Sequence, residues 1–90
     1  MDDLREALSA YSHHAWVGGM VFLFGVSVHH PDGSVTIPSR FVTQWRRQMT
    51  TVYTDLSNDE KASDRNEADR ILAITRRWRR NGDETEQGEL

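Results

Sequence analysis

The sequence contains no cysteine, and this absence removes several classes of protein. A disulfide framework and a zinc site with cysteine ligands are both excluded, and a reducing cytoplasm is the expected compartment. A long apolar run is also missing: the longest covers residues 16–28, whereas a membrane-spanning helix needs about 20 such residues. The chain opens with MDDLREAL, which is acidic and unlike a secretory leader. We therefore expect a cytoplasmic protein without a membrane segment.

An excess of charge of one sign is missing from most of the chain. The formal net charge is −3, but residues 81–90 hold four acidic residues and no basic one. The other eleven basic and ten acidic residues give residues 1–80 a net charge of +1. We predict a single helical domain over residues 1–80 and an acidic, disordered tail over residues 81–90. This balance makes both nucleic acid and membranes unlikely partners.

The first part of the chain predicts a helix from Asp2 or Asp3 to about Val26, because apolar residues recur there at spacings of three and four. The second half is ambiguous, since glycines weaken a helix by about 1 kcal/mol each and valines favour strands. A hairpin within residues 17–37 that turns at HPDG is the alternative, and the continuous helix is favoured. The helical face consists of Leu4, Leu8, Tyr11, Ala15, Gly18 and Phe22.

Two further helices are expected. The turn HHPDGS leads into a short extended segment at residues 35–37, and a second helix runs from about Ser39 to residues 50–51. A third begins at a capping box of Ser57 and Glu60 and runs to about Arg80. No alternation strong enough for a sheet is visible. The expected fold class is all-α: a small three-helix domain with a short extended segment between helices 1 and 2.

The polar run DLSNDEKASDR ends at an unexpected position on the third helix. Stepping back from Ala68 by four and seven residues places Asp64 and Lys61 on the helix's apolar stripe. Asp64 is therefore expected to face the core or its edge, where a carboxylate needs a partner. A structural staple and the polar wall of a ligand pocket both stay open, and plain surface is the least favoured reading. The stripe consists of Ala68, Ile71, Leu72, Thr75 and Trp78.

Motifs for catalysis or metal binding are lacking. There is no P-loop, no nucleophile elbow and no cysteine nucleophile, so we expect neither an enzyme nor a cofactor. The histidines form two adjacent pairs, at 13–14 and 29–30, and neighbouring side chains on a helix diverge, so no metal site is expected. His13 lies three residues before Trp16 on one helical face, where the two could enclose a site.

Arginines cluster at residues 46–47 and 76–80, and each cluster has a tryptophan nearby, Trp45 or Trp78. The favoured interpretation of the second cluster is a solvated helix end, where positive charge suits the helix dipole. Phosphate or nucleotide binding is an alternative, because arginines with aromatic rings are what such ligands need. Duplex DNA binding is the least favoured of the three.

The apolar half of the first helix is too large for two short partner helices to cover. A large exposed apolar patch marks an interface, so we expect a homo-oligomer that forms through this helix. Glycines would allow the close approach of another backbone. The expected interface consists of Gly18, Gly19, Phe22, Leu23 and Val26.

Several of these residues together resemble the ryanodine-receptor-type repeat domain. His13-x-x-Trp16 near the start is followed by Tyr53-x-x-Leu56-x-x-x-Glu60-Lys61-x-x-Asp64-Arg65, and then by a helix with Ala68 and Leu72. The segment WRRQM and the run from DG to IP also look like small uncharacterised phage and bacterial proteins. The interval between Trp16 and Tyr53 is longer than in the receptor repeat, and this is a lone copy, so a channel-regulating role is not carried over.

The resemblance implies a helical binding module without catalysis, in phage or bacteria, where such domains are associated with nucleotide-signal defence systems. The implied role is to bind or sequester a nucleotide-derived signal, of the cyclic nucleotide or ADP-ribose type, as an anti-defence protein. Two alternatives stay open: a DNA- or RNA-binding regulator that uses the arginines at 76–80, and a purely structural protein-interaction subunit. The implied ligand-binding residues are His13, Trp16, Arg46, Arg47, Tyr53, Lys61, Asp64 and Arg65.

Overall fold

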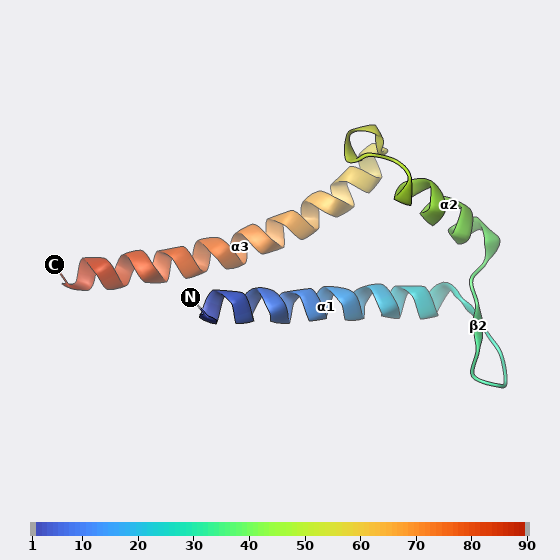
Figure 1. Cartoon of the computed structure of the whole chain (residues 1–90), viewed down its shortest axis with the longest axis horizontal. Coiled ribbons are helices and arrows are strands. Elements are labelled where there is room, and N and C mark those ends of the chain that lie inside the picture. The colour runs from blue at the N-terminus through green and yellow to red at the C-terminus, as the bar shows by residue number, and fades with distance from the viewer. Residues whose placement is uncertain (1, 90) are drawn as a thin grey trace.

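The computed structural model describes the backbone of residues 2–89 and the side chains of residues 3–80. Its three helices and one small hairpin confirm the predicted fold class. The elements in order are α1 (Asp2–Val26), β1 (Val28–His29), β2 (Val35–Thr36), α2 (Ser39–Met49), the 3-10 turn η1 (Tyr53–Asp55) and α3 (Asn58–Glu89). Figure 1 shows that α1 and α3 run in opposite directions, lie close at the ends of the chain and separate towards α2.

Helix α1 is continuous to Val26, as predicted, and its glycines do not break it. The helix ends where the Ser27 hydroxyl donates a hydrogen bond to the Leu23 carbonyl at 2.6 Å. This bond satisfies one of the last carbonyls, which have no partner within the helix. Ser27, 9% exposed, is the one buried residue among those whose side chains are described.

The hairpin that sequence analysis treated as the alternative to a helix exists beside it. Residues 28 and 29 pair with 36 and 35 in an antiparallel ladder of two residues per strand. The expectation that no sheet forms was therefore wrong at this point. The alternation of apolar and polar residues was too short to recognise, because each strand has only two residues. The hydrogen bonds of the turn fix most of the hairpin.

The hairpin turn explains why its residues are Pro, Asp and Gly. The His30 N–H donates to the Ser34 carbonyl at 2.9 Å, which leaves a loop of three residues. Pro31 fixes its own φ, and Gly33 has a φ of +91°, the left-handed conformation that closes such loops. The Asp32 carboxylate accepts bonds from the Ser34 N–H and hydroxyl at 2.9 and 2.7 Å, and these bonds lower the Asp32 pKa.

Helix α2 packs one aromatic face against α1. The rings of Phe22 and Phe41 lie edge to face, with centroids 6.1 Å apart, and Trp45 lies 6.5 Å from Phe22 and 5.5 Å from Phe41. At the other end of α2 the hydroxyls of Thr50 and Thr51 bond to the last carbonyls of the helix. These two threonines end the helix close to the predicted position.

The capping box at the start of α3 is present. The Glu60 N–H donates to the Ser57 hydroxyl at 3.2 Å, and the Ser57 N–H donates to the Glu60 carboxylate at 3.1 Å. Two backbone donors without helical partners are thereby satisfied by each other's side chains. The predicted start of the third helix is confirmed.

The other end of α3 differs from the prediction. The helix continues to Glu89, well beyond Arg80, because a single glycine at 82 costs only about 1 kcal/mol and no proline follows it. The predicted disordered tail covers residues 81–90, whose side chains are not among the described residues, so this part stays a prediction.

The face of α3 that packs on α1 is shifted from the predicted stripe. Ala68, Ile71 and Leu72 are exposed, whereas Glu67 and Ile74 are partly buried, as are Thr75 and Trp78 of the predicted stripe. The Tyr11 hydroxyl donates a hydrogen bond to the Glu67 carboxylate, which raises the Tyr11 pKa. The Tyr11–Glu67 pair therefore lies where α1 and α3 meet. The apolar residues that were predicted to be buried lie at the edge of this contact.

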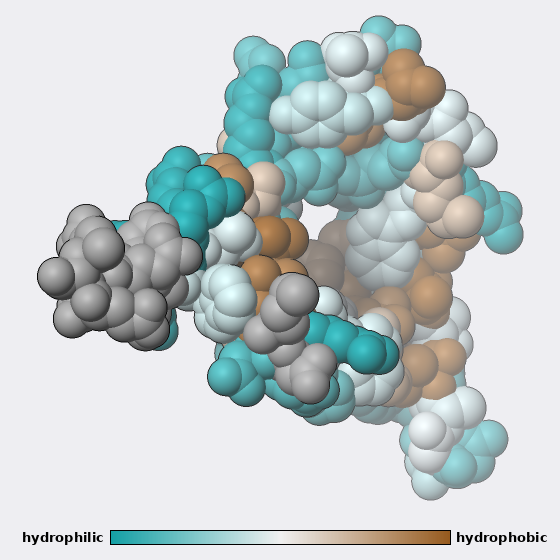
Figure 2. All heavy atoms as spheres, turned by 60° about the vertical axis from the view of Figure 1, so that its left-hand side comes forward, coloured by the Kyte–Doolittle hydropathy of each residue, from teal (hydrophilic) through white to brown (hydrophobic). Residues whose placement is uncertain are grey.

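The three helices do not enclose a core. No apolar side chain is buried among residues 3–80. The radius of gyration is 18.8 Å, against roughly 12 Å for a compact domain of this length. Figure 2 shows an opening through the molecule, with hydrophobic side chains exposed at its edge and on the outer surface. The described part of the chain is therefore an open frame: α1, α2 and α3 surround an opening and do not pack around a core.

Replacing the cap residue tests the start of α3. We expect Ser57→Ala to lower the free energy of unfolding by about 1 kcal/mol, because the Glu60 N–H loses its acceptor. Ser63→Ala, a matched change at an exposed position within α3, should cost no stability. Urea titrations followed by circular dichroism measure both, and equal losses would contradict the capping role.

Candidate functional site

The residues predicted to bind a ligand are distributed over the frame in separate small groups. On α1, the His13 and Trp16 rings stack with centroids 6.0 Å apart and planes 27° apart. Trp16 is 60% exposed, so this pair lies on the surface and does not close a cavity. It is an aromatic platform that faces solvent.

A second group joins α2 to α3. Arg47 forms an ion pair with Glu60, and its second guanidinium nitrogen lies 3.4 Å from the other carboxylate oxygen. The Glu60 side chain is 11% exposed and the Arg47 side chain 52%. The Arg47 guanidinium, with help from the Ser57 N–H, lowers the pKa of Glu60 from 4.5 to about 2, and the same pair raises the Arg47 pKa. Arg47 is therefore engaged within the chain.

Lys61 and Tyr53 form the third group. The Lys61 ammonium lies 5.9 Å from the centre of the Tyr53 ring, at the outer limit of a cation–π contact. Lys61 is partly buried and Tyr53 is 44% exposed. This contact holds η1 against the first turn of α3 and leaves one side of the ring in solvent.

The prediction that Asp64 faces the core was wrong. Asp64 is exposed, and no hydrogen bond or ion pair joins it to any residue within the part of the chain that the structure describes. The reason is geometric: α1 and α3 separate towards α2, so the start of α3 has no part of α1 beside it (Figure 1). Arg65 and Arg46 are exposed as well.

Three hollows on the described surface lie elsewhere. One of about 450 Å³ lies along the arginine end of α3, one of about 420 Å³ along the start of α1, and one of about 160 Å³ between α1 and α3. None of them is lined by any of the eight predicted ligand residues. The structure therefore keeps those residues as local pairs and does not bring them together around one ligand.

No metal site is found in the described part of the chain, where no three His, Asp or Glu side chains converge. Two of the histidines support the hairpin. A His29 ring nitrogen lies 2.8 Å from the Phe24 carbonyl, and one of His30 lies 2.6 Å from the Thr36 hydroxyl. Both act as structural residues of the loop.

Sequence analysis expected the apolar half of α1 to stay exposed, but the interface residues it named do not include those of the outer face. Val17, Val21 and Phe24 are 39%, 67% and 48% exposed, and they recur at spacings of four and three on one side of the helix. Gly18 and Gly25 border this side, and a methyl group added at either would meet nothing within 4 Å. The signal is visible in the sequence as a second apolar spacing, at residues 17, 21 and 24.

Comparison with known proteins gives no relative: no family model, no curated protein and no solved structure matches this chain. The resemblance to the ryanodine-receptor-type repeat therefore stays an expectation. Among the described residues, no helix combines the length and the hydrophobicity that crossing a bilayer requires.

The Glu60 pKa gives a prediction about acid. Because the folded-state pKa of about 2 lies below the ordinary 4.5, Glu60 contributes stability above pH 4.5 that is lost as the pH falls towards 2. We expect Glu60→Gln to be less stable than the parent at neutral pH and to lose less stability over that interval. Chemical denaturation at a series of pH values measures this.

Asp64→Asn is the matched control, because it also removes one carboxylate from α3 but breaks no ion pair of the described residues. It should keep the parent's stability at neutral pH and the parent's pH dependence. If the two variants behave alike, the Arg47 pair does not carry the effect.

Proposed function

We propose that this protein is a non-enzymatic helical interaction module that works as a homo-oligomer assembled through the outer face of α1. The observation that carries the proposal is the missing core. The chain exposes 7591 Å², whereas a folded protein of 10.4 kDa exposes roughly 5,400 Å². The chain thus exposes roughly 2,200 Å² more than a compact monomer of its mass, and an interface between two copies would bury part of this area.

A second copy fits this surface better than another kind of partner. The exposed residues at the centre, Val17, Val21 and Phe24, are aliphatic or aromatic and carry no charge, as in the centre of a permanent interface. A two-fold axis through α1 would set the same face of both copies together, and the open Gly18 and Gly25 would let the backbones approach closely. The residues predicted for the interface, among them Phe22, then border the contact and do not form its centre.

The nucleotide-derived ligand implied by the family resemblance is not what we propose. None of the eight residues that would bind it lines the three hollows described above, and Arg47 and Lys61 already contact Glu60 and Tyr53 within the chain. A self-associating module requires no such pocket.

The mass of the protein in solution tests the proposal. We expect a dimer or larger oligomer by sedimentation velocity, and we expect Val21→Glu to weaken association at least tenfold, because it places two charges in the apolar contact. Val21 makes no aromatic or hydrogen-bonded contact with another element of the described chain, so the change acts on the interface. Thr43→Glu, at an exposed position of α2, should leave the mass unchanged. A monomeric parent would overturn the proposal.

Cysteine cross-linking locates the interface independently, since the natural chain has no cysteine to interfere. A disulfide needs two Cα atoms within about 7 Å, so only residues near the two-fold axis can link to their own copies. Mild oxidation should link two chains of Val21→Cys or Gly25→Cys, whereas Thr43→Cys should stay single. Linking at position 43 and not on α1 would place the interface elsewhere.

A further inference from the structure

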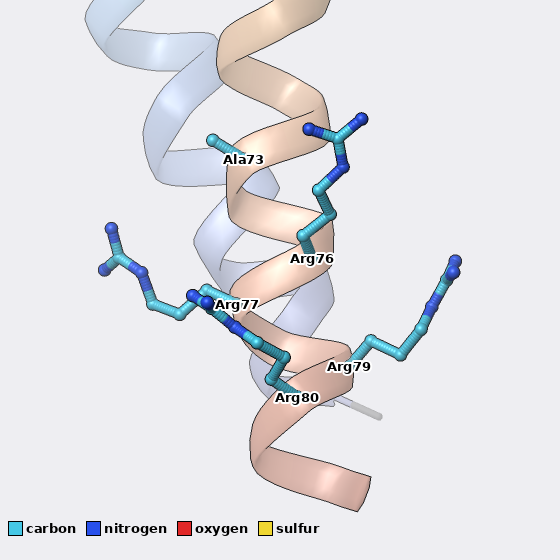
Figure 3. Close-up of a pocket in the computed structure, with 5 residues that line it drawn as sticks. All are labelled: Ala73, Arg76, Arg77, Arg79 and Arg80. Carbon is cyan, nitrogen blue, oxygen red and sulfur yellow. The ribbon is translucent and has the colours of Figure 1, made fainter.

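The arginine cluster of α3, at residues 76–80, forms a surface that self-association does not use. Arg76, Arg77, Arg79 and Arg80 lie within five positions and are all exposed. Together with Ala73 they line the hollow of about 450 Å³. Figure 3 shows their side chains leaving α3 on two sides, Arg76 and Arg79 on one and Arg77 and Arg80 on the other. Two guanidinium groups therefore lie on each side of α3.

We propose that this arginine cluster of α3 binds duplex DNA through phosphates on both walls of the major groove. An α-helix with its side chains is about 10–12 Å wide, and the groove is about 12 Å wide. A helix lying in it has one phosphate backbone on each side, which is where the two pairs of arginines point. Arginine pairs with phosphate through two parallel hydrogen bonds, so four contacts are available.

The small side chain of Ala73 lies on the same side of α3 as Arg77 and Arg80 (Figure 3). The three residues follow each other at spacings of four and three, so they share one side of the helix. A small residue there leaves room for a phosphate backbone to reach the two arginines. No other side chain of the hollow can hydrogen-bond a base edge except the arginines themselves. Because the proposal engages the arginines with phosphates, which carry no sequence information, the binding is expected to be independent of sequence.

Base stacking plays no part in this proposal. Trp78 is partly buried and lines the hollow between α1 and α3 with Ala7 and Ile74. Its ring is thus on the side of α3 opposite the groove and is not offered to an unstacked base. A single strand, which such proteins hold by stacking, gains nothing here over a duplex.

Acidic residues bound this surface along the chain. Asp69 precedes it on α3, and the sequence has Asp83, Glu84, Glu86 and Glu89 after it. Only residues 73–80 therefore enter the groove, a length of roughly 10 Å. The affinity should be that of non-specific binding, with a dissociation constant of about 10⁻⁴–10⁻⁶ M at physiological salt.

The salt dependence of DNA binding by the full chain tests the proposal. With a fluorescent 20-base-pair duplex, four phosphate contacts predict a slope of about −3.6 for log K against log salt, or a loss on the order of 100-fold between about 50 and about 200 mM. Arg76→Gln with Arg79→Gln should reduce the slope to about −1.8, and Arg77→Gln with Arg80→Gln should do the same. The matched control, Arg46→Gln with Arg65→Gln, removes the same charge from other exposed positions and should keep the parent's slope.

Three results would overturn the proposal: no binding at the lowest salt, equal losses in the control and in the two double variants, or tighter binding to anionic vesicles than to DNA. An A-form RNA duplex of the same sequence tests the groove itself, because its major groove is too narrow for a helix. We expect it to bind at least tenfold more weakly, and equal binding would contradict the groove. Circular dichroism of each variant verifies that the helices are intact.

Discussion

The constraint on which everything else in this molecule depends is the small amount of apolar surface that the chain can bury by itself. Ordering one residue costs about 1–2 kcal/mol of backbone entropy, and burial at about 25 cal/mol per Å² is the main term that offsets it. By mass, the unfolded chain exposes roughly 15,000 Å², so folding to 7591 Å² hides only about half of it, where about 60% is usual. Caps and ion pairs cannot replace a core, and the proposed association with a second copy would supply the missing area.

Two contacts, or joints, between helices fix the shape of the frame although little apolar area is buried. The rings of Phe22, Phe41 and Trp45 fix α2 on the end of α1, and the Arg47–Glu60 pair fixes α3 on α2. Glu60 belongs to both the second joint and the capping box, so the start of α3 and its direction relative to α2 depend on one carboxylate. A frame with such joints presents α1 at a defined angle, and a two-fold interface requires this.

The sequence predicts the parts of this structure that depend on near neighbours. The capping box of Ser57 and Glu60, the end of α1 at Val26 and the turn at Gly33 all follow from residues within four positions of each other. Asp64 could not be placed in the same way. Its predicted position follows only if α1 runs beside α3 along the whole of the helix. The two helices separate instead, because α2 and the hairpin lie between their far ends (Figure 1).

The two proposed surfaces are compatible because they lie on different sides of the frame. Val17 and Val21 are exposed on α1, and the arginines at 76, 79 and 80 are exposed on α3 and do not line the hollow between the two helices. A dimer formed through α1 would therefore leave both arginine ends accessible. Two weak sites held in one rigid assembly bind a long polyanion more tightly than either site alone, because the second contact forms at a high effective concentration. Self-association and DNA binding would then reinforce each other: the interface that completes the fold would also double the number of phosphates that one assembly can contact.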